Sequence, residues 1–383
     1  MNKFDFVTYP DKFNKGYLKF DSLKEDELPL SIADMDFLVS PKIYEALKER
    51  LDLKTYGYVS IDSSFYQAYI DYYKTKYDFD ISSSSMSFSL GVLPSLSSII
   101  KTLSLPNDFI ATLTPAYNCF FNEIRNNGRK VIEVPLFLKE NNFEIDFNLL
   151  ESSFKKAKIF ILCNPHNPSG KVFSKEELIK IASLAKKYQV FVISDEIHSP
   201  IVRKGIPFYP FLSVSNDAKE VGITLFSVTK GWNLASIQTS LVFSFNKESM
   251  EKIEIGLNRD DVNEPNLLSI PASKAALSSL SWLEEANEVI FSNKDFACFY
   301  IKKNIPRLIA HNGDSTYLLW IDISKLNMDS NEFSLLLRKE SGLIVSSGLV
   351  YGDSSFIRIN VALPRKKLID ALDRLKKCCD LIK

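Results

Sequence analysis

Between residues 109 and 245 the sequence alternates short, almost continuous apolar runs with polar clusters and amphipathic stretches. A strand buried on both faces has no polar side, so such runs, alternating with helices, are typical of a parallel sheet covered by helices. One intervening stretch, 174–188, begins with Ser174 and Glu177 in the spacing of a capping box and is predicted to be a helix. The pattern predicts an α/β fold. The apolar runs cover 109–113, 130–134, 158–163, 190–194 and 221–226.

Polar residues follow three of these runs. Asn167 comes after 158–163, Asp195 after 190–194, and Lys230 after 221–226. The carboxyl ends of parallel strands meet at one edge of the sheet, where ligands bind. A single lysine among 47 lysines and arginines is usually a solvated surface group. The shared position of the three residues is what predicts a site.

These three residue types suit pyridoxal phosphate, which needs a lysine for covalent attachment and a carboxylate for its ring nitrogen. An asparagine can donate a hydrogen bond to the ring oxygen O3′. The phosphate needs N–H donors, and residues 91–93, in a glycine turn that opens a helix over 96–103, offer them, although a plain turn and helix cap explain that stretch more simply. Further candidates are Ser227 and Thr229 for the phosphate, Tyr117 for stacking on the ring, and Arg358 for the substrate carboxylate.

Composition excludes several other classes of protein. Lys+Arg and Asp+Glu both number 47, so there is no basic surplus for nucleic acid. No signal peptide is visible, and no apolar run approaches the roughly 18 residues of a membrane span, so a cytoplasmic protein is expected. Five irregularly spaced cysteines predict no disulfide framework, and three histidines make a metal centre hard to build. The motifs GxGxxG, GxxxxGK[ST], HExxH and GxSxG are absent.

The length of 383 residues exceeds the usual size of a single core, about 250–300 residues, so two domains are expected. After residue 265 a long helical stretch is followed by short strands at 316–321 and 356–361 and by a helix at 365–382. We predict a large domain at 45–280 and a small α+β domain made of 1–44 and 281–383.

Tyr117, the run Asn-Pro-His-Asn-Pro-Ser-Gly (164–170), Asp195, Ser-Val-Thr-Lys (227–230) and Arg358 occur in this order. The ordered set resembles the fold-type I pyridoxal-phosphate enzymes of aminotransferase class I/II. The phrases 28–37, 56–58, 195–198, 230–235 and 356–365 are similar to the MalY/PatB branch of cystathionine β-lyases. The resemblance implies an aspartate-aminotransferase-like fold, with a mostly parallel seven-stranded sheet covered by helices and a smaller α+β domain.

The resemblance also implies a role for each matching residue. Lys230 would hold the cofactor and then act as the general base, while Asp195 would pair with the ring nitrogen. Asn167 would contact O3′ beside His198. The remaining roles are stacking for Tyr117, phosphate contacts for Gly91, Val92, Leu93, Ser227 and Thr229, a reach into the partner subunit for Tyr58, and substrate binding for Arg358, Ala33 and Tyr117. Shared sites of this kind imply a homodimer.

Taken alone, several of these residues have simpler interpretations. His198 and Tyr117 could be core residues, Arg358 a surface residue, and Asp34 a structural residue or helix cap. The sequence also departs from the branch at Ser31, Asn118, Cys119, Pro200, Gly231 and Ser236. These positions are expected near the substrate and in loops, so they concern substrate range more than cofactor binding.

Two hypotheses of activity share one residue set. The first is a carbon–sulfur β-lyase that converts cystathionine- or cysteine-type amino acids into a thiol, pyruvate and ammonia. The second is an aminotransferase acting on an L-amino acid. A third, a regulatory protein with this fold and no turnover, is disfavoured because the lysine and the aspartate are both present.

Overall fold

The computed structural model describes residues 3–382. Its large sheet has eight strands, of which five neighbours, β8 to β4, run parallel. β9 is antiparallel to β8 and β2, and β5 folds back on β4. The spatial order is β2 (Met86–Ser89), β9 (Ser240–Phe243), β8 (Gly222–Phe226), β7 (Phe191–Asp195), β6 (Ala157–Cys163), β3 (Phe109–Thr114), β4 (Lys130–Lys139) and β5 (Asn142–Ile145).

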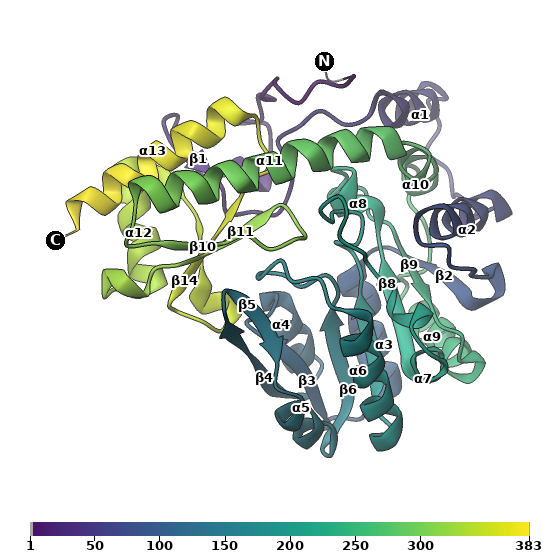
Figure 1. Ribbon diagram of the computed structural model, residues 1–383. Helices are drawn as coiled ribbons and strands as arrows, with labels where there is room; N and C mark the ends of the chain where they lie inside the picture. Colours follow the sequence, from purple (N-terminus) through teal and green to yellow (C-terminus); the bar gives the residue numbers. More distant parts are fainter. Residues whose placement is uncertain (1–2, 383) are drawn as a thin grey trace.

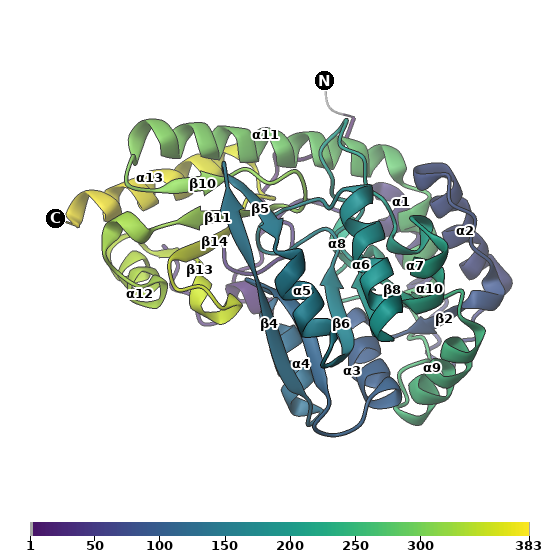
Figure 2. The ribbon, with the colours of Figure 1, turned by 60° about the horizontal axis from the view of Figure 1, so that its bottom comes forward.

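The predicted α/β class with a mostly parallel sheet is confirmed, but the sheet has one strand more than the seven expected. β4 continues to Lys139, five residues beyond its predicted end. Glu140 and Asn141 then take left-handed backbone angles, with φ of 49° and 71°, and the chain returns as β5. Left-handed residues in a two-residue turn match the twist of paired strands, which explains the hairpin. Figure 2 shows its long first strand at the edge of the sheet.

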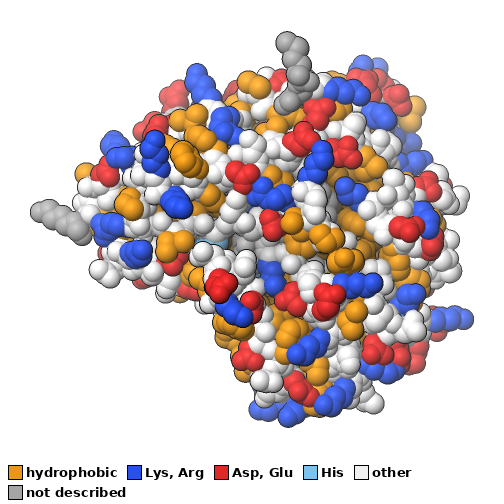
Figure 3. All heavy atoms as spheres, viewed as in Figure 1, with side chains coloured by type: hydrophobic (Ala, Val, Ile, Leu, Met, Phe, Trp, Pro, Cys, Tyr) orange, Lys and Arg blue, Asp and Glu red, His pale blue; other side chains and the backbone are white. Residues whose placement is uncertain are grey.

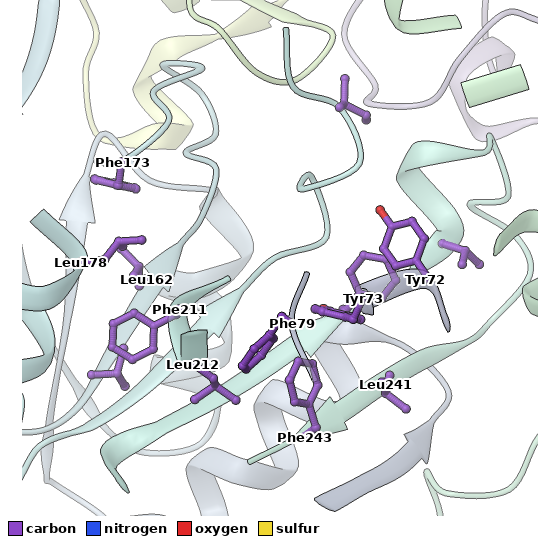
Figure 4. Close-up of a cluster of buried hydrophobic side chains, with 14 of the residues drawn as sticks. Tyr72, Tyr73, Phe79, Leu162, Phe173, Leu178, Phe211, Leu212, Leu241 and Phe243 are labelled. Carbon is purple, nitrogen blue, oxygen red and sulfur yellow. The ribbon is translucent and has the colours of Figure 1, made fainter. Parts of the chain in front are cut away.

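Helices cover both faces of this sheet, as predicted (Figure 1). In β6, Ile159 and Ile161 face one helix layer while Phe160 and Leu162 face the other, so the whole strand is apolar. One layer consists of α3 (Val92–Leu103), α4 (Asn118–Asn126) and α9 (Lys247–Arg259). The other includes α2 (Ser63–Tyr77), α5 (Phe147–Phe154), α6 (Lys175–Tyr188), α7 (Asn216–Val221) and α10 (Ser269–Leu277). Figure 4 shows the aromatic packing on this second face.

The predicted helix start at Ser174 is confirmed, whereas α3 begins at Val92, before its predicted start at residue 96. At α6 the Ser174 hydroxyl accepts from Glu177 N at 3.1 Å, and Ser174 N donates to the Glu177 carboxylate at 2.8 Å, which completes the capping box. The short α8 (Val228–Gly231) follows β8 and carries Lys230. Helix α1 (Pro41–Asp52) precedes α2 in the chain.

A second, smaller sheet builds a separate core with the C-terminal helices (Figure 1). Its order is β10 (Ile309–His311), β11 (Leu318–Asp322), β14 (Phe356–Asn360) and β13 (Ser346–Ser347). β1 (Leu28–Pro29) pairs with β12 (Leu343–Ile344), so the N-terminal segment joins this part of the molecule. The surrounding helices are α11 (Leu280–Asn304), α12 (Ser330–Ser341) and α13 (Arg365–Leu381).

Helix α11 connects the two cores, because Ala286 and Ile290 pack into the large one while Ala297 and Ile301 pack into the small one. The domain limits 45–280 and 1–44 with 281–383 stay a prediction. β11 begins at Leu318 rather than at 316, because Thr316 has a left-handed φ of 60°.

Charges of both signs are mixed over the face shown in Figure 3, in keeping with the equal numbers of acidic and basic residues. Within residues 3–382, no helix combines the length and the apolar character that a membrane crossing requires.

Candidate active site

The ends of β6, β7 and β8 bring Asn167, Asp195 and Lys230 to one pocket of about 260 Å³. Cys163 and Asp195 are directly paired across β6 and β7, and Asp195 is paired with Leu225 of β8, so the three strands end at the same level. The convergence predicted from topology is therefore present. Eleven predicted residues line this pocket: Ala33, Gly91, Val92, Leu93, Tyr117, Asn167, Asp195, His198, Ser227, Thr229 and Lys230.

Lys230 points its amine at the N-terminal segment. Its Nζ donates a hydrogen bond to the carbonyl oxygen of Ala33 at 2.6 Å. Burial lowers the pKa of Lys230 to about 8, and the nearby carboxylate of Asp34 opposes part of this fall. A lysine with a lowered pKa is more often neutral near physiological pH, which suits a nucleophile or a base.

Asp195 is buried at the end of β7, with 3% of its surface exposed. Its Oδ1 accepts from Ile197 N at 3.1 Å, and no lysine or arginine of the described chain forms an ion pair with it. Burial raises the pKa of Asp195 to about 7, against a lowering effect from Lys230. A buried carboxylate normally has a cationic partner, so this site is suited to a ligand that brings a positive charge.

Arg358 lies behind Asn167 rather than on the pocket wall. Its Nη1 donates to Asn167 Oδ1 at 3.1 Å and its Nη2 to the Ser31 carbonyl at 2.9 Å. Because the guanidinium occupies the amide oxygen, the amide nitrogen of Asn167 remains as a donor toward the pocket. Arg358 Nε is buried and, within the part of the chain that the structure describes, has no hydrogen-bond partner.

Two rings enclose the pocket from other elements. Tyr117 precedes α4, and its ring packs edge to face against that of Phe120, with 5.6 Å between the ring centroids. Burial raises the pKa of the Tyr117 hydroxyl. The ring of His198 packs against that of Tyr317, with 6.0 Å between the ring centroids. Burial lowers the pKa of His198 to about 3, so its ring is neutral. Its Nδ1 is buried without a partner among the described residues and is free to meet a ligand.

The start of α3 and the start of α8 form the opposite end of the pocket. No side chain caps α3, so the N–H groups that follow Gly91 face the pocket without a side-chain acceptor from residues 3–382. Ser227 is less available than predicted, because its hydroxyl donates to the Thr239 carbonyl at 2.7 Å. The Thr229 hydroxyl, 2.9 Å from Ser227 Oγ, can turn toward the pocket.

Besides Arg358, a second predicted residue, Tyr58, lies outside the pocket. Tyr58 sits between α1 and α2 with its side chain fully exposed. Its contact with a partner subunit stays a prediction.

Sequence reasoning missed three polar residues at the pocket. Gln238 and Thr239 line it, just before β9. Tyr317 donates from its hydroxyl to the same Ala33 carbonyl that Lys230 contacts, at 2.9 Å. The one local signal for Gln238 and Thr239 was their position eight and nine residues after Lys230, before an apolar run.

Two of the unusual residues, Pro200 and Gly231, are direct neighbours. A Cβ atom on Gly231 would lie 2.8 Å from Pro200 Cβ and 3.1 Å from Pro200 Cγ. The proline ring fills the space that a larger residue at 231 requires. The two departures therefore compensate each other.

We expect Gly231→Ala to lower the free energy of unfolding by about 1–3 kcal/mol, because the added methyl group overpacks this contact. Pro200→Gly, combined with Gly231→Ala, should recover part of the loss. A double-mutant cycle in urea measures the coupling. Gly57→Ala is the matched control, since no atom lies within 4 Å of its added Cβ. Additive effects at 200 and 231 would contradict the compensation.

Comparisons with known proteins agree with this geometry. Residues 25–375 match the family model described as aminotransferase class I and II. Cystathionine beta-lyase PatB of Bacillus subtilis is 32% identical over 356 residues, which is 92% of each chain. Among solved structures, cystalysin from Treponema denticola, which contains a pyridoxal 5′-phosphate cofactor, has a TM-score of 0.95 at 29% identity and covers 99% of this chain and 100% of its own.

A PLP-bound putative aminotransferase from Clostridium difficile also has a TM-score of 0.95, at 34% identity, and covers 98% of this chain and 100% of its own. The resemblance inferred from the ordered motifs is confirmed. With the family match over most of its length and with strand ends that bring lysine, aspartate and asparagine to one pocket, the chain belongs to the aminotransferase class I and II family.

Proposed function

We propose that this chain is a pyridoxal-phosphate-dependent carbon–sulfur β-lyase. It cleaves cystathionine- or cysteine-type amino acids to a thiol, pyruvate and ammonia. Relatives of similar length named cystathionine beta-lyase support the reaction, among them PatB and a Corynebacterium glutamicum protein at 29% identity. The pocket built from Lys230, Asp195 and Asn167 is the observation that carries the proposal.

The pocket fits pyridoxal phosphate. Asp195 is a buried carboxylate that forms no ion pair within residues 3–382, and a protonated ring nitrogen would supply the cation. The uncapped start of α3 and the Thr229 hydroxyl suit the phosphate. Asn167 keeps an amide donor for the ring oxygen O3′, and His198 adds an unpaired ring nitrogen beside it.

When bound, pyridoxal phosphate supplies an electron sink for negative charge at the substrate Cα. Lys230 takes the proton from Cα, and its lowered pKa suits this task because a base works best with a pKa near the working pH. Asp195 keeps a proton on the ring nitrogen. Tyr117, which lines the pocket, would lie against the ring, and Arg358, whose Nε has no partner among residues 3–382, would bind the substrate carboxylate. The segment at Ala33 contacts Lys230 directly.

The second candidate, an aminotransferase, uses the same residues up to the loss of the Cα proton. It is favoured by the family name and by the putative aminotransferase of similar structure. Product analysis separates the two activities. Incubation with cystathionine should yield thiol and pyruvate in equal amounts without a keto-acid acceptor. A strict need for an acceptor would reject the lyase.

Arg358→Lys should raise KM for the amino acid about 100-fold and change kcat less. A lysine cannot contact Asn167, the Ser31 carbonyl and a carboxylate together, because it lacks the planar fork of five donors. Steady-state kinetics measure the split between KM and kcat. Arg203→Lys is the control, since Arg203 binds Asp295 and Asp314 outside the pocket. Equal losses in both variants would contradict the assignment.

We also infer a homodimer with shared sites. Two exposed aromatic side chains support this. Tyr56 is 73% exposed and Tyr58 is fully exposed, and a loop with solvent-exposed aromatic side chains suits an interface. Mixing Lys230→Ala with Tyr58→Ala subunits should restore activity that neither variant has alone, because each hybrid contains one intact site. No restoration would reject shared sites. A cytoplasmic location stays a prediction.

A further inference from the structure

The segment 33–37 lies directly over Lys230 and is fastened to the loop that carries it. Ala33 O receives hydrogen bonds from Lys230 Nζ and from the Tyr317 hydroxyl. Asn233, three residues after Lys230, accepts from Met35 N at 3.1 Å and donates to Phe37 O at 2.8 Å. The lysine amine and the backbone beside Asp34 are therefore held together as one unit.

A buried ion network fixes the carboxylates of this segment. Lys19 Nζ lies 3.1 Å from Asp34 Oδ1 and 2.6 Å from Asp36 Oδ2. Lys12 Nζ lies 2.9 Å from the other oxygen of Asp36. Asp36 thus forms ion pairs with two lysines, whereas Asp34 forms an ion pair with Lys19, which also binds Asp36. Asp34 directly follows Ala33, whose carbonyl binds the Lys230 amine, and its negative charge raises the pKa of Lys230 and of Tyr317.

Several groups face the Lys230 amine. Burial has the largest effect on the pKa of Lys230 and lowers it. Among the charged groups, Asp34 has the largest effect and raises this pKa. Arg358 lowers this pKa, and Asp195 and Cys119 raise it. His198, which lines the same pocket, and Tyr317, which donates to the same Ala33 carbonyl, are uncharged. In the proposed function Asp195 is matched by the cofactor ring, which leaves Asp34 as the main negative charge available to the lysine.

We propose that Asp34 is a positioning residue for catalysis: held by Lys19, its carboxylate keeps the free amine of Lys230 at the Ala33 carbonyl and stabilises the proton that the amine takes from the substrate. The ion network thereby connects the N-terminal segment to the reacting lysine. The segment 28–37 thereby takes part in positioning the lysine as well as in the fold. This inference rests on the proposed role of Lys230 as the base.

Asp34→Asn tests it in the full chain. In the holoenzyme, the midpoint of the pH titration of the cofactor's visible absorbance should fall by about one pH unit, because an opposite charge is lost. In the cofactor-free chain, competitive acetylation followed by mass spectrometry should show the same fall for Lys230. Asp34→Glu keeps the charge and should stay near the wild-type midpoint. Tyr317→Phe removes a hydrogen bond to Ala33 O without changing charge and should also leave the midpoint in place.

An unchanged midpoint in Asp34→Asn overturns the proposal, and so does an equal fall in Tyr317→Phe, which would point to a misplaced segment rather than a lost charge. Circular dichroism checks folding. If Asp34→Asn does not fold, the combined Lys19→Met and Asp34→Asn variant replaces both members of the Lys19–Asp34 pair, leaves Lys12 as the partner of Asp36, and is judged by the same midpoint. These readouts do not depend on products, so a fall in the midpoint without release of thiol would reject the lyase while this inference stands.

Discussion

Lys230→Ala is expected to lower kcat by about 10⁴-fold or more, because one side chain supplies both the covalent attachment and the general base. Partial burial lowers the pKa of the amine to about 8, and its one hydrogen bond among residues 3–382 is to the Ala33 carbonyl. Steady-state assays of thiol and pyruvate release measure the loss. Borohydride reduction followed by mass spectrometry should place the cofactor on Lys230 in the wild type and leave it unattached in the variant.

Lys294 provides a matched control for this experiment. It is a fully buried lysine, and burial lowers its pKa, as it does that of Lys230, to about 7. Its Nζ donates to the carbonyls of Gly313 and Ser315, at 2.5 and 2.8 Å, in the loop before β11. Lys294→Met should reduce stability and leave the attachment at Lys230 intact. Attachment of the cofactor to any other lysine in the wild type would contradict the site.

The identity of the pocket could be predicted because topology alone brings Asn167, Asp195 and Lys230 together. Each follows an apolar run, and parallel strands end at a common edge. No unusual local sequence is needed for that step. The roles of the individual residues remain proposals, since they depend on how a cofactor sits among them.

Contacts made through irregular backbone could not be predicted. Tyr317 reaches Ala33 because Thr316 takes a left-handed conformation just before β11, and no periodic pattern encodes that bend. The hairpin of β4 and β5 was missed for a related reason. Its turn, Glu140 and Asn141, contains neither glycine nor proline, although both residues are left-handed.

The buried ion network illustrates a third limit. Nothing in the sequence distinguishes its members from ordinary surface charges, yet the structure buries Lys12, Lys19 and Asp36. A buried ion pair forms only when long-range packing brings both members together and removes water. The pairing of Gly231 with Pro200 is similar, because it is visible as two separate departures in the sequence and as one contact in the structure.

Asp195→Asn should abolish most activity and yet stabilise the cofactor-free protein. We expect kcat to fall about 10³-fold or more, because a neutral amide cannot keep the ring nitrogen protonated and the electron sink is weakened. Binding of pyridoxal phosphate should weaken as well. Glu196→Gln is the matched control: Glu196 is the next residue, its pKa is likewise raised by burial, to about 8, and it does not line the pocket.

The stability effect has a definite sign. Burial raises the pKa of Asp195 from 3.8 to about 7 in the folded chain. A raised pKa means that the folded state holds the proton more tightly, so the contribution to stability is present below pH 3.8 and is lost as the pH rises through 7. Above pH 7 the ionised carboxylate costs about 4 kcal/mol, at roughly 1.4 kcal/mol per pH unit.

Asparagine avoids this charge and keeps an oxygen that can accept from Ile197 N. Without the cofactor, the variant should therefore be more stable than the wild type at pH 8, and the difference should shrink as the pH falls toward 4. Urea unfolding at several pH values measures it. Adding pyridoxal phosphate should stabilise the wild type far more than the variant, because only the carboxylate gains a cation. A cofactor-free Asp195→Asn protein that is less stable than the wild type at pH 8 would show that the carboxylate is already paired within the protein, and the case for a cationic ring at this position would be lost.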